Sequence, residues 1–526
     1  MARTSHSRTR NSILNIVTGL GGQFVSIVLK FLCRTVFIHT LGKVYLGVNG
    51  FFSDILTLLS LTELGFDTAI AFKLFKPLAD GDDKRVRVLM KFYKQAYRTV
   101  GTVILVLGIG LIWTLPYLIK DYGSLKALGI NAVLIFLLHI ARSVSSYWFF
   151  AYRSAIMKAN QQKYVLDVVD CGIDLVTNVA KILVLLLLKD FVLYTATVIV
   201  FNILRNLINA TIATRRYPQF FAREEDNLSR AEIWGLLKDC GALFLYKVNI
   251  VVVKATGNTI ISFFLGLGYV GLYSNYLLFL ATIKSLLDRL YTAVNASMGN
   301  LFATVSEAKR YQFFRVMNFL SVILYGTAGL GVALCADELI VCWVGTDYVL
   351  EKPFAMLVGL EILFHGLKMN LGQIRNVSGI FRQMWYRPLL SILINLGTAI
   401  TLVRYWGIPG VVCGILVADL TTNLLFDPLI IHKYGFGSYR LLGSYYLKNG
   451  SYLLLLAAIG IGDSWLCKTV LPVGGWMAFL VHILIVSVSV PLLFMTVCWK
   501  SDECHYLVHL AGVQVGKFLG KRKAPA

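Results

Sequence analysis

Long apolar stretches separated by short polar segments recur along the whole chain. Windows of about nineteen residues are the length of helix that crosses a bilayer core of about 30 Å, and they pick out fourteen candidate spans. These spans run over residues 12–38, 46–68, 99–119, 128–150, 165–188, 191–212, 241–264, 270–294, 316–336, 353–373, 388–404, 410–431, 451–467 and 475–498. The pattern predicts an all-α polytopic membrane protein with about 14 transmembrane helices.

Composition agrees with this pattern, because 57% of the 526 residues are hydrophobic and 15% are charged. Soluble proteins carry about 25% charged residues. The segments between spans are at most about thirty residues long, which leaves no room for a nucleotide-sugar domain. The chain also lacks the G-x-x-x-x-G-K-[ST] phosphate loop of ATP-hydrolysing proteins. We therefore predict a protein that is not an enzyme and needs no cofactor or metal, and a membrane polysaccharide polymerase is a weaker alternative.

The formal net charge is +22, from 50 Lys and Arg against 28 Asp and Glu. With the N-terminus inside, 33 of the 50 cations fall in cytoplasmic segments and 7 in outer loops, as the positive-inside rule requires. This distribution predicts a cell-membrane protein with both termini in the cytoplasm and accounts for the charge without nucleic acid. Segment 72–98 is basic and amphipathic, so we expect an interfacial helix pair there on anionic membrane lipids.

An internal repeat is visible at an offset of 224 residues. Residues 41–48 (LGKVYLGV) align with residues 265–272 (LGLGYVGL), and in the same register Lys30 aligns with Lys254. The period corresponds to six spans, so both copies keep one orientation and face each other across a midplane cavity. We predict an N-terminal six-helix lobe over 1–220, a C-terminal six-helix lobe over 221–440, and two additional helices with a basic tail over 441–526.

The sequence resembles the Wzx-type polysaccharide flippases of the multidrug/oligosaccharidyl-lipid/polysaccharide exporter superfamily. The resemblance lies in residues 34–56 (RTVFIHTLGKVYLGVNGFFSDIL), 61–70 (LTELGFDTAI) and 76–80 (KPLAD), and locally covers about residues 10–100. It implies two six-helix lobes in a V and alternating access. It also implies a polyprenyl-diphosphate-linked oligosaccharide as cargo, moved to the outer leaflet for polysaccharide biosynthesis, with other polysaccharide-assembly proteins as partners.

Ten cations remain within the predicted spans, where an ionised group costs about 2.5–3.5 kcal/mol unless it faces a cavity or a partner. Arginine grips phosphate oxygens bidentately and lysine supplies a point charge, so together they suit a diphosphate. Lys284 and Arg289 lie near a predicted cytoplasmic end, where snorkelling explains them. The predicted cationic binding set is Lys30, Arg34, Arg142, Lys181, Lys247 and Lys254.

Acidic groups and one histidine also lie within the spans. They are Asp54, Asp174, Glu361, His365 and Asp419. Two interpretations remain open for them: neutralisation of neighbouring cations, or a Na⁺ or H⁺ coupling site, since buried acids and histidines titrate near neutral pH.

A multidrug or small-solute exporter of the same superfamily is the alternative function. An exporter of cations would need an acid-lined cavity, whereas the predicted one is rich in cations. Among the nine cysteines, Cys335 and Cys342 both lie at the predicted outer face, where a disulfide between them is conceivable.

Overall fold

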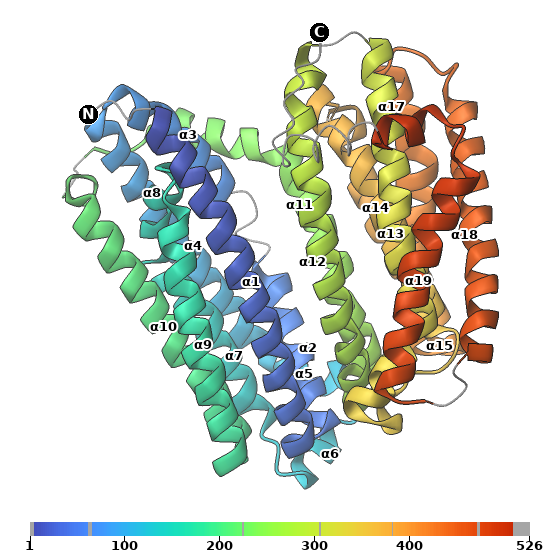
Figure 1. The fold of residues 1–526 in the computed structure, drawn as a ribbon. Helices are drawn as coiled ribbons and strands as arrows, with labels where there is room; N and C mark the ends of the chain where they lie inside the picture. Colours follow the sequence, from blue (N-terminus) through green and yellow to red (C-terminus); the bar gives the residue numbers. More distant parts are fainter. Residues whose placement is uncertain are drawn as a thin grey trace. The chain divides into compact units, whose positions relative to one another are not determined.

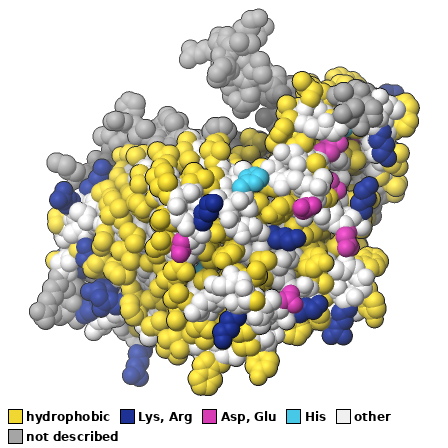
Figure 2. All heavy atoms as spheres, turned by 90° about the horizontal axis from the view of Figure 1, so that it is seen from below, with side chains coloured by type: hydrophobic (Ala, Val, Ile, Leu, Met, Phe, Trp, Pro, Cys, Tyr) yellow, Lys and Arg dark blue, Asp and Glu magenta, His cyan; other side chains and the backbone are white. Residues whose placement is uncertain are grey.

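The computed structural model describes residues 5–60, 66–222, 226–304, 307–380, 382–470 and 474–508. Within these ranges every regular element is a helix, and each predicted span coincides with one or more helices. Nine of the described helices are long and apolar enough to cross a membrane, or ten if the bent pair Ala132–Trp148 and Ala151–Ala159 forms one span. On the face shown in Figure 2, hydrophobic side chains predominate around scattered Lys and Arg. The predicted all-α membrane fold is confirmed, while the count of fourteen stays a prediction.

The chain divides into two compact units, residues 1–274 and 275–526. The helices of unit 1 are α1 (Ser5–Leu41), α2 (Lys43–Leu59), α3 (Phe66–Asp80), α4 (Asp83–Leu111), α5 (Leu115–Leu118), α6 (Tyr122–Ala127), α7 (Ala132–Trp148), α8 (Ser154–Ala159), α9 (Lys163–Leu187), α10 (Phe191–Arg216) and α11 (Arg230–Phe264) (Figure 1). The next helix, α12 (Leu267–Thr304), begins in unit 1 and ends in unit 2. The lobe boundaries predicted from the repeat, at residues 220 and 440, stay a prediction.

In unit 1, α1 packs along α9, α4 packs on α7, and α10 packs on both α7 and α9. Aromatic side chains pack between α2 and α7: Phe52 lies against Phe136 with ring centroids 5.0 Å apart, and both are fully buried. Buried residues recur at helical spacing along these helices, so each helix packs an apolar face against its neighbours.

The prediction of a separate interfacial helix pair over 72–98 is partly wrong. A turn does separate two helices: Gly81 adopts a left-handed φ of 73°, and the Asp82 side chain caps α4 by accepting from the Arg85 amide at 2.8 Å. The helix that begins there, however, continues without interruption to Leu111. The basic residues at its start therefore belong to an extension of the third span, because nothing in the sequence after the cap interrupts helix formation.

The repeat seen in the sequence is visible in the backbone of unit 1. Gly42 and Gly266, 224 residues apart, both have left-handed φ angles, 82° and 103°, at the starts of α2 and α12. Only glycine adopts this conformation without strain. One turn further on, a Cβ added at Gly47 would collide with the carbonyl oxygen of Leu267.

The same contact occurs in reverse within unit 1. A Cβ added at Gly271 would collide with the carbonyl oxygen of Lys43, and position 43 is the repeat equivalent of Leu267. The starts of α2 and α12 thus meet in a pseudo-two-fold crossing, backbone against backbone. We call this contact of Gly47 and Gly271 the glycine crossing.

Unit 2 contains the rest of α12, then α13 (Glu307–Val344), α14 (Phe354–Ser378), α15 (Arg387–Trp406), α16 (Ile408–Ala418), a π-helical segment (Asp419–Phe426), α17 (Asp427–Gly435), α18 (Leu442–Val470) and α19 (Trp476–Val497). Helix α13 packs against α14, α18 and α19, and α15 packs against α16. Phe319, Tyr452 and Phe494 meet in the core that joins α13, α18 and α19. The two additional helices therefore form part of this unit.

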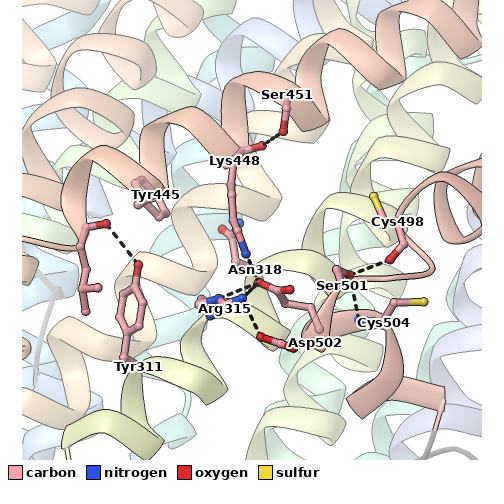
Figure 3. A network of polar contacts seen from close by, with 12 residues as sticks. Tyr311, Arg315, Asn318, Tyr445, Lys448, Ser451, Cys498, Ser501, Asp502 and Cys504 are labelled. Carbon is pink, nitrogen blue, oxygen red and sulfur yellow. Dashed lines mark hydrogen bonds and ion pairs between the residues drawn. The ribbon is translucent and has the colours of Figure 1, made fainter.

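A polar network fixes the segment that follows α19 (Figure 3). The buried Glu503 accepts from Arg315 of α13 and from Lys448 of α18, each at 2.6 Å. Burial opposes ionisation of this group, but the two charged donors prevail and lower the pKa of the Glu503 carboxyl to about 2. The carboxylate therefore stays ionised at physiological pH and holds the segment after α19 against α13 and α18.

Candidate functional site

Three cations of the predicted binding set lie close together in unit 1. Arg34 comes from α1, Arg142 from α7 and Lys181 from α9. The charges of Arg34 and Arg142 both act on the Tyr194 hydroxyl of α10, and the Lys181 ammonium lies 5.6 Å from the centroid of the Tyr194 ring. We call these three side chains the unit 1 cation cluster, with Tyr194 at its centre.

The surroundings of the cluster are apolar or weakly polar. The Cys33 thiol is buried and interacts electrostatically with both Lys181 and Tyr194. Phe37 packs edge-on against Tyr194 with ring centroids 5.1 Å apart. A setting of this kind screens charge poorly, so it strengthens attraction to an anion and raises the cost of leaving the cations without one.

In the part of the chain that the structure describes, two members of this cluster, Arg142 and Lys181, have no paired carboxylate. Among the described residues, no Asp or Glu oxygen lies within the 4.0 Å ion-pair distance of Arg142 or Lys181. The neighbouring carboxylates serve another base: Asp174 pairs with Arg205 of α10, whose guanidinium also lies 3.7 Å from Asp170. Arg142 and Lys181 therefore carry positive charge that no described carboxylate pairs with, while the charge of Asp174 acts on Lys181 from a greater distance.

Unit 2 shows the opposite arrangement. Lys284 of α12 pairs with the buried Glu361 of α14, and Lys368 of α14 pairs with Asp419 at 2.7 Å. Asp419 begins the π-helical segment and also accepts from Asn423. The snorkelling proposed for Lys284 is therefore wrong, because its ammonium points to a carboxylate on a neighbouring helix.

His365 also lies among the paired charges of unit 2. Its Nε2 lies 2.9 Å from Asp288, which also accepts from the Tyr325 hydroxyl at 2.7 Å. At the start of α17, Asp427 is held by Arg375 of α14 at 3.5 Å and by Arg387 of α15 at 3.1 Å. These charged side chains of unit 2 thus satisfy one another across helices, as buried charges generally must.

This balance gives the first prediction. Lys368→Met leaves Asp419, which is 6% exposed, buried without its base, and should destabilise the protein by about 3–5 kcal/mol. The double variant Lys368→Met/Asp419→Leu removes both charges and should recover most of that loss. Thermal unfolding of the detergent-solubilised proteins measures both effects. Equal losses in the single and the double variant would contradict the pairing.

The other predicted site residues are distributed differently. Lys30 and Lys254 have exposed side chains and Lys247 a half-buried one, so their place in a cavity stays a prediction. Asp54 of α2 accepts from Asn258 of α11 at 2.6 Å, and the charge of Lys254 acts on it. Cys335 and Cys342 are both free thiols, so the disulfide considered from the sequence does not form.

Sequence reasoning missed three contributors. Tyr194 carries no charge and lies among other aromatic residues at the start of a span, so no pattern distinguished it. Asn258 follows Lys254 by four residues on one helix face, and that spacing could have identified it. Asp288 lies four residues after Lys284, which gave the same kind of signal.

The fold resembles that of known membrane transporters, although no family model matches the sequence and no curated protein matches it either. A solved structure of the lipid II flippase MurJ, in an inward closed conformation, superposes with a TM-score of 0.62 at 14% identity. The match covers 92% of this chain and 99% of that one.

Two further structures belong to the MATE group. An inward-facing multidrug resistance MATE family transporter of the MOP superfamily has a TM-score of 0.53 at 13% identity, covering 78% of this chain and 94% of that one. The MATE multidrug transporter DinF-BH has a TM-score of 0.50 at 14% identity, covering 80% and 95%. The chain has the fold of these transporters. At such identities the likeness extends to the fold alone.

Proposed function

We propose that the protein is a flippase that moves a polyprenyl-diphosphate-linked oligosaccharide from the cytoplasmic to the outer leaflet by alternating access. The observation that carries the proposal is the unit 1 cation cluster, where Arg34, Arg142 and Lys181 converge on Tyr194. The fold shared with a lipid II flippase supports a transport function of this class.

The chemistry of the cluster fits a diphosphate. A diphosphate presents several anionic oxygens, and two guanidinium groups can each hold two of them while the ammonium of Lys181 binds a further one. The Phe37 ring and the Cys33 thiol keep this part of unit 1 poorly solvated. A cationic cargo would meet repulsion at the same place.

An apolar cavity in unit 2 suits the hydrocarbon part of such a cargo. It has a volume of about 340 Å³ and lies between α12, α13 and α19. Its walls are almost entirely hydrophobic and include Phe279, Leu287, Ile323, Val332, Ile483 and Pro491. An isoprenoid chain could occupy this space within the membrane.

The membrane potential would assist this direction of movement. Moving one charge across 100 mV is worth about 2.3 kcal/mol, and an anion is driven out of a negative interior. A flippase for an anionic head group therefore requires less energy from an ion gradient than an importer of the same group.

Multidrug export remains the second candidate, favoured by the fold likeness to the MATE transporters. Deletion of the gene separates the two functions. The flippase predicts that lipid-linked oligosaccharide accumulates on the cytoplasmic leaflet, which a membrane-impermeant glycan-binding probe on sealed vesicles of each orientation measures. An unchanged leaflet distribution together with new sensitivity to organic cations would support drug export instead.

A further inference from the structure

Asp54 of α2 differs from Asp170 and Asp174 of α9, because a neutral amide bonds to it and no described base pairs with it. Asn258 donates to it through Nδ2 at 2.6 Å, and among the described residues no base lies within ion-pair distance. Asp170 and Asp174, by contrast, lie within that distance of Arg205. A largely buried carboxylate without a base is costly as an anion and much less so as a neutral acid.

The Asn258 amide that bonds Asp54 lacks a hydrogen-bond donor for its own oxygen among the described residues. Asn258 is 3% exposed, and its Oδ1 is buried with no donor. Because Oδ1 and Nδ2 belong to one terminal amide, this acceptor lies next to the donor that bonds Asp54. A buried acceptor of this kind costs about 1–3 kcal/mol until a donor reaches it.

One proton satisfies both groups. If Asp54 is protonated, its second oxygen becomes a hydroxyl that donates to Asn258 Oδ1, while Asn258 Nδ2 still donates to the first oxygen. The result is a cyclic acid–amide pair with two hydrogen bonds and no orphaned atom. A sodium ion could be bound by the Asp54 carboxylate and Asn258 Oδ1, but it would have to displace the Asn258 Nδ2 donor from Asp54.

We propose that Asp54 and Asn258 form a proton-binding site that joins α2 to α11. Protonation closes the acid–amide pair, and release of the proton leaves a single hydrogen bond between the two helices. The helices packed against α2 also carry Arg34, His139 and Arg142, but the charge that acts on Asp54 is that of Lys254. This ammonium stabilises the carboxylate after release and so makes the exchange reversible.

The proposed proton site lies beside the glycine crossing. Gly50 of α2, one turn before Asp54, lies at the glycine crossing, where an added Cβ would be 2.9 Å from the Ser274 hydroxyl and 3.6 Å from Asn258 Nδ2. Helix α12 runs from this crossing into unit 2. This part of the inference rests on the proposed flippase function. In that function, the site would couple protonation to transport through the packing of α2 on α11 and α12.

Infrared difference spectroscopy of the purified full-length protein in lipid nanodiscs tests proton binding without any cargo. Acidification should produce the C=O band of a buried carboxylic acid, and Asp54→Asn should abolish it. Asn258→Leu leaves the acid in place and should shift the band to higher frequency, because both hydrogen bonds to the amide are lost. Asp463→Asn is the matched control, since that buried acid accepts from Ser489 in unit 2 and should leave the Asp54 band unchanged.

Two results would overturn the proposal. One is a titrating band that persists in Asp54→Asn and is unmoved in Asn258→Leu. The other is saturable loss of the band on adding NaCl at constant pH, which would make sodium the occupant. Because the spectrum does not depend on transport, a negative leaflet assay with a positive titration would reject the flippase and leave the proton site standing.

Discussion

Replacement of all three cluster cations, in Arg34→Gln/Arg142→Gln/Lys181→Gln, is expected to give a protein that reaches the membrane and does not flip lipid-linked oligosaccharide. Hydrogen bonds to charged groups contribute about 1.5–3 kcal/mol each. Losing three therefore weakens binding of the diphosphate by on the order of 10³-fold or more, at 1.4 kcal/mol per tenfold. The leaflet distribution of the glycolipid, measured at matched membrane levels of protein, gives the result.

Two comparison proteins make this experiment specific. Arg142→Lys keeps the charge but loses the bidentate geometry, so it should retain part of the activity. Lys284→Gln/Glu361→Gln also removes a cation from a span, but takes its carboxylate partner with it and should retain flipping. Normal flipping by the triple variant, or equal loss in the neutral pair variant, would reject the cluster as the anion site.

The second large effect is expected at the glycine crossing. Gly47→Val places a branched side chain against the carbonyl oxygen of Leu267, which is backbone and cannot rotate away. Overpacking ordinarily costs about 1–3 kcal/mol, and a clash with backbone on a buried face should reach or exceed the upper end. Little folded protein should be recovered after extraction in detergent, as measured by size-exclusion chromatography.

Gly268→Val provides the matched control, because a Cβ at this nearby position on α12 has no atom within 4 Å. Gly271→Val should behave like Gly47→Val, since the contact is reciprocal. Wild-type recovery of both Gly47→Val and Gly271→Val would mean that the helices cross elsewhere.

Much of the fold could be predicted from the sequence because membrane insertion leaves few choices. Backbone groups in lipid must bond internally, so each apolar stretch of about twenty residues becomes a helix. The repeat was readable because Gly42 and Gly266 have the same backbone requirement. The length of α4 was misjudged because amphipathicity is alike in an interfacial helix and in the extension of a span.

The partners of the charged groups could not be predicted. Spacing along a helix shows which residues share a face, but the residue opposite lies on another helix, often more than fifty positions away, as Asp419 does from Lys368. Hence Lys284 was assigned to snorkelling when it pairs with Glu361, and the excess charge of Arg142 and Lys181 became visible only beside the balanced pairs of unit 2.

The offset of 224 residues that relates the two hairpins places Arg34 on Asn258. In the function proposed above, the same helical position holds a phosphate-binding guanidinium in one copy and the amide partner of an acid in the other. Such divergence predicts an order of gene history: an ancestral six-helix lobe that assembled as a symmetric dimer would have carried one chemistry twice. Fusion into one chain would have freed the two equivalent positions to specialise, with anion capture proposed at Arg34 and proton exchange proposed at Asn258.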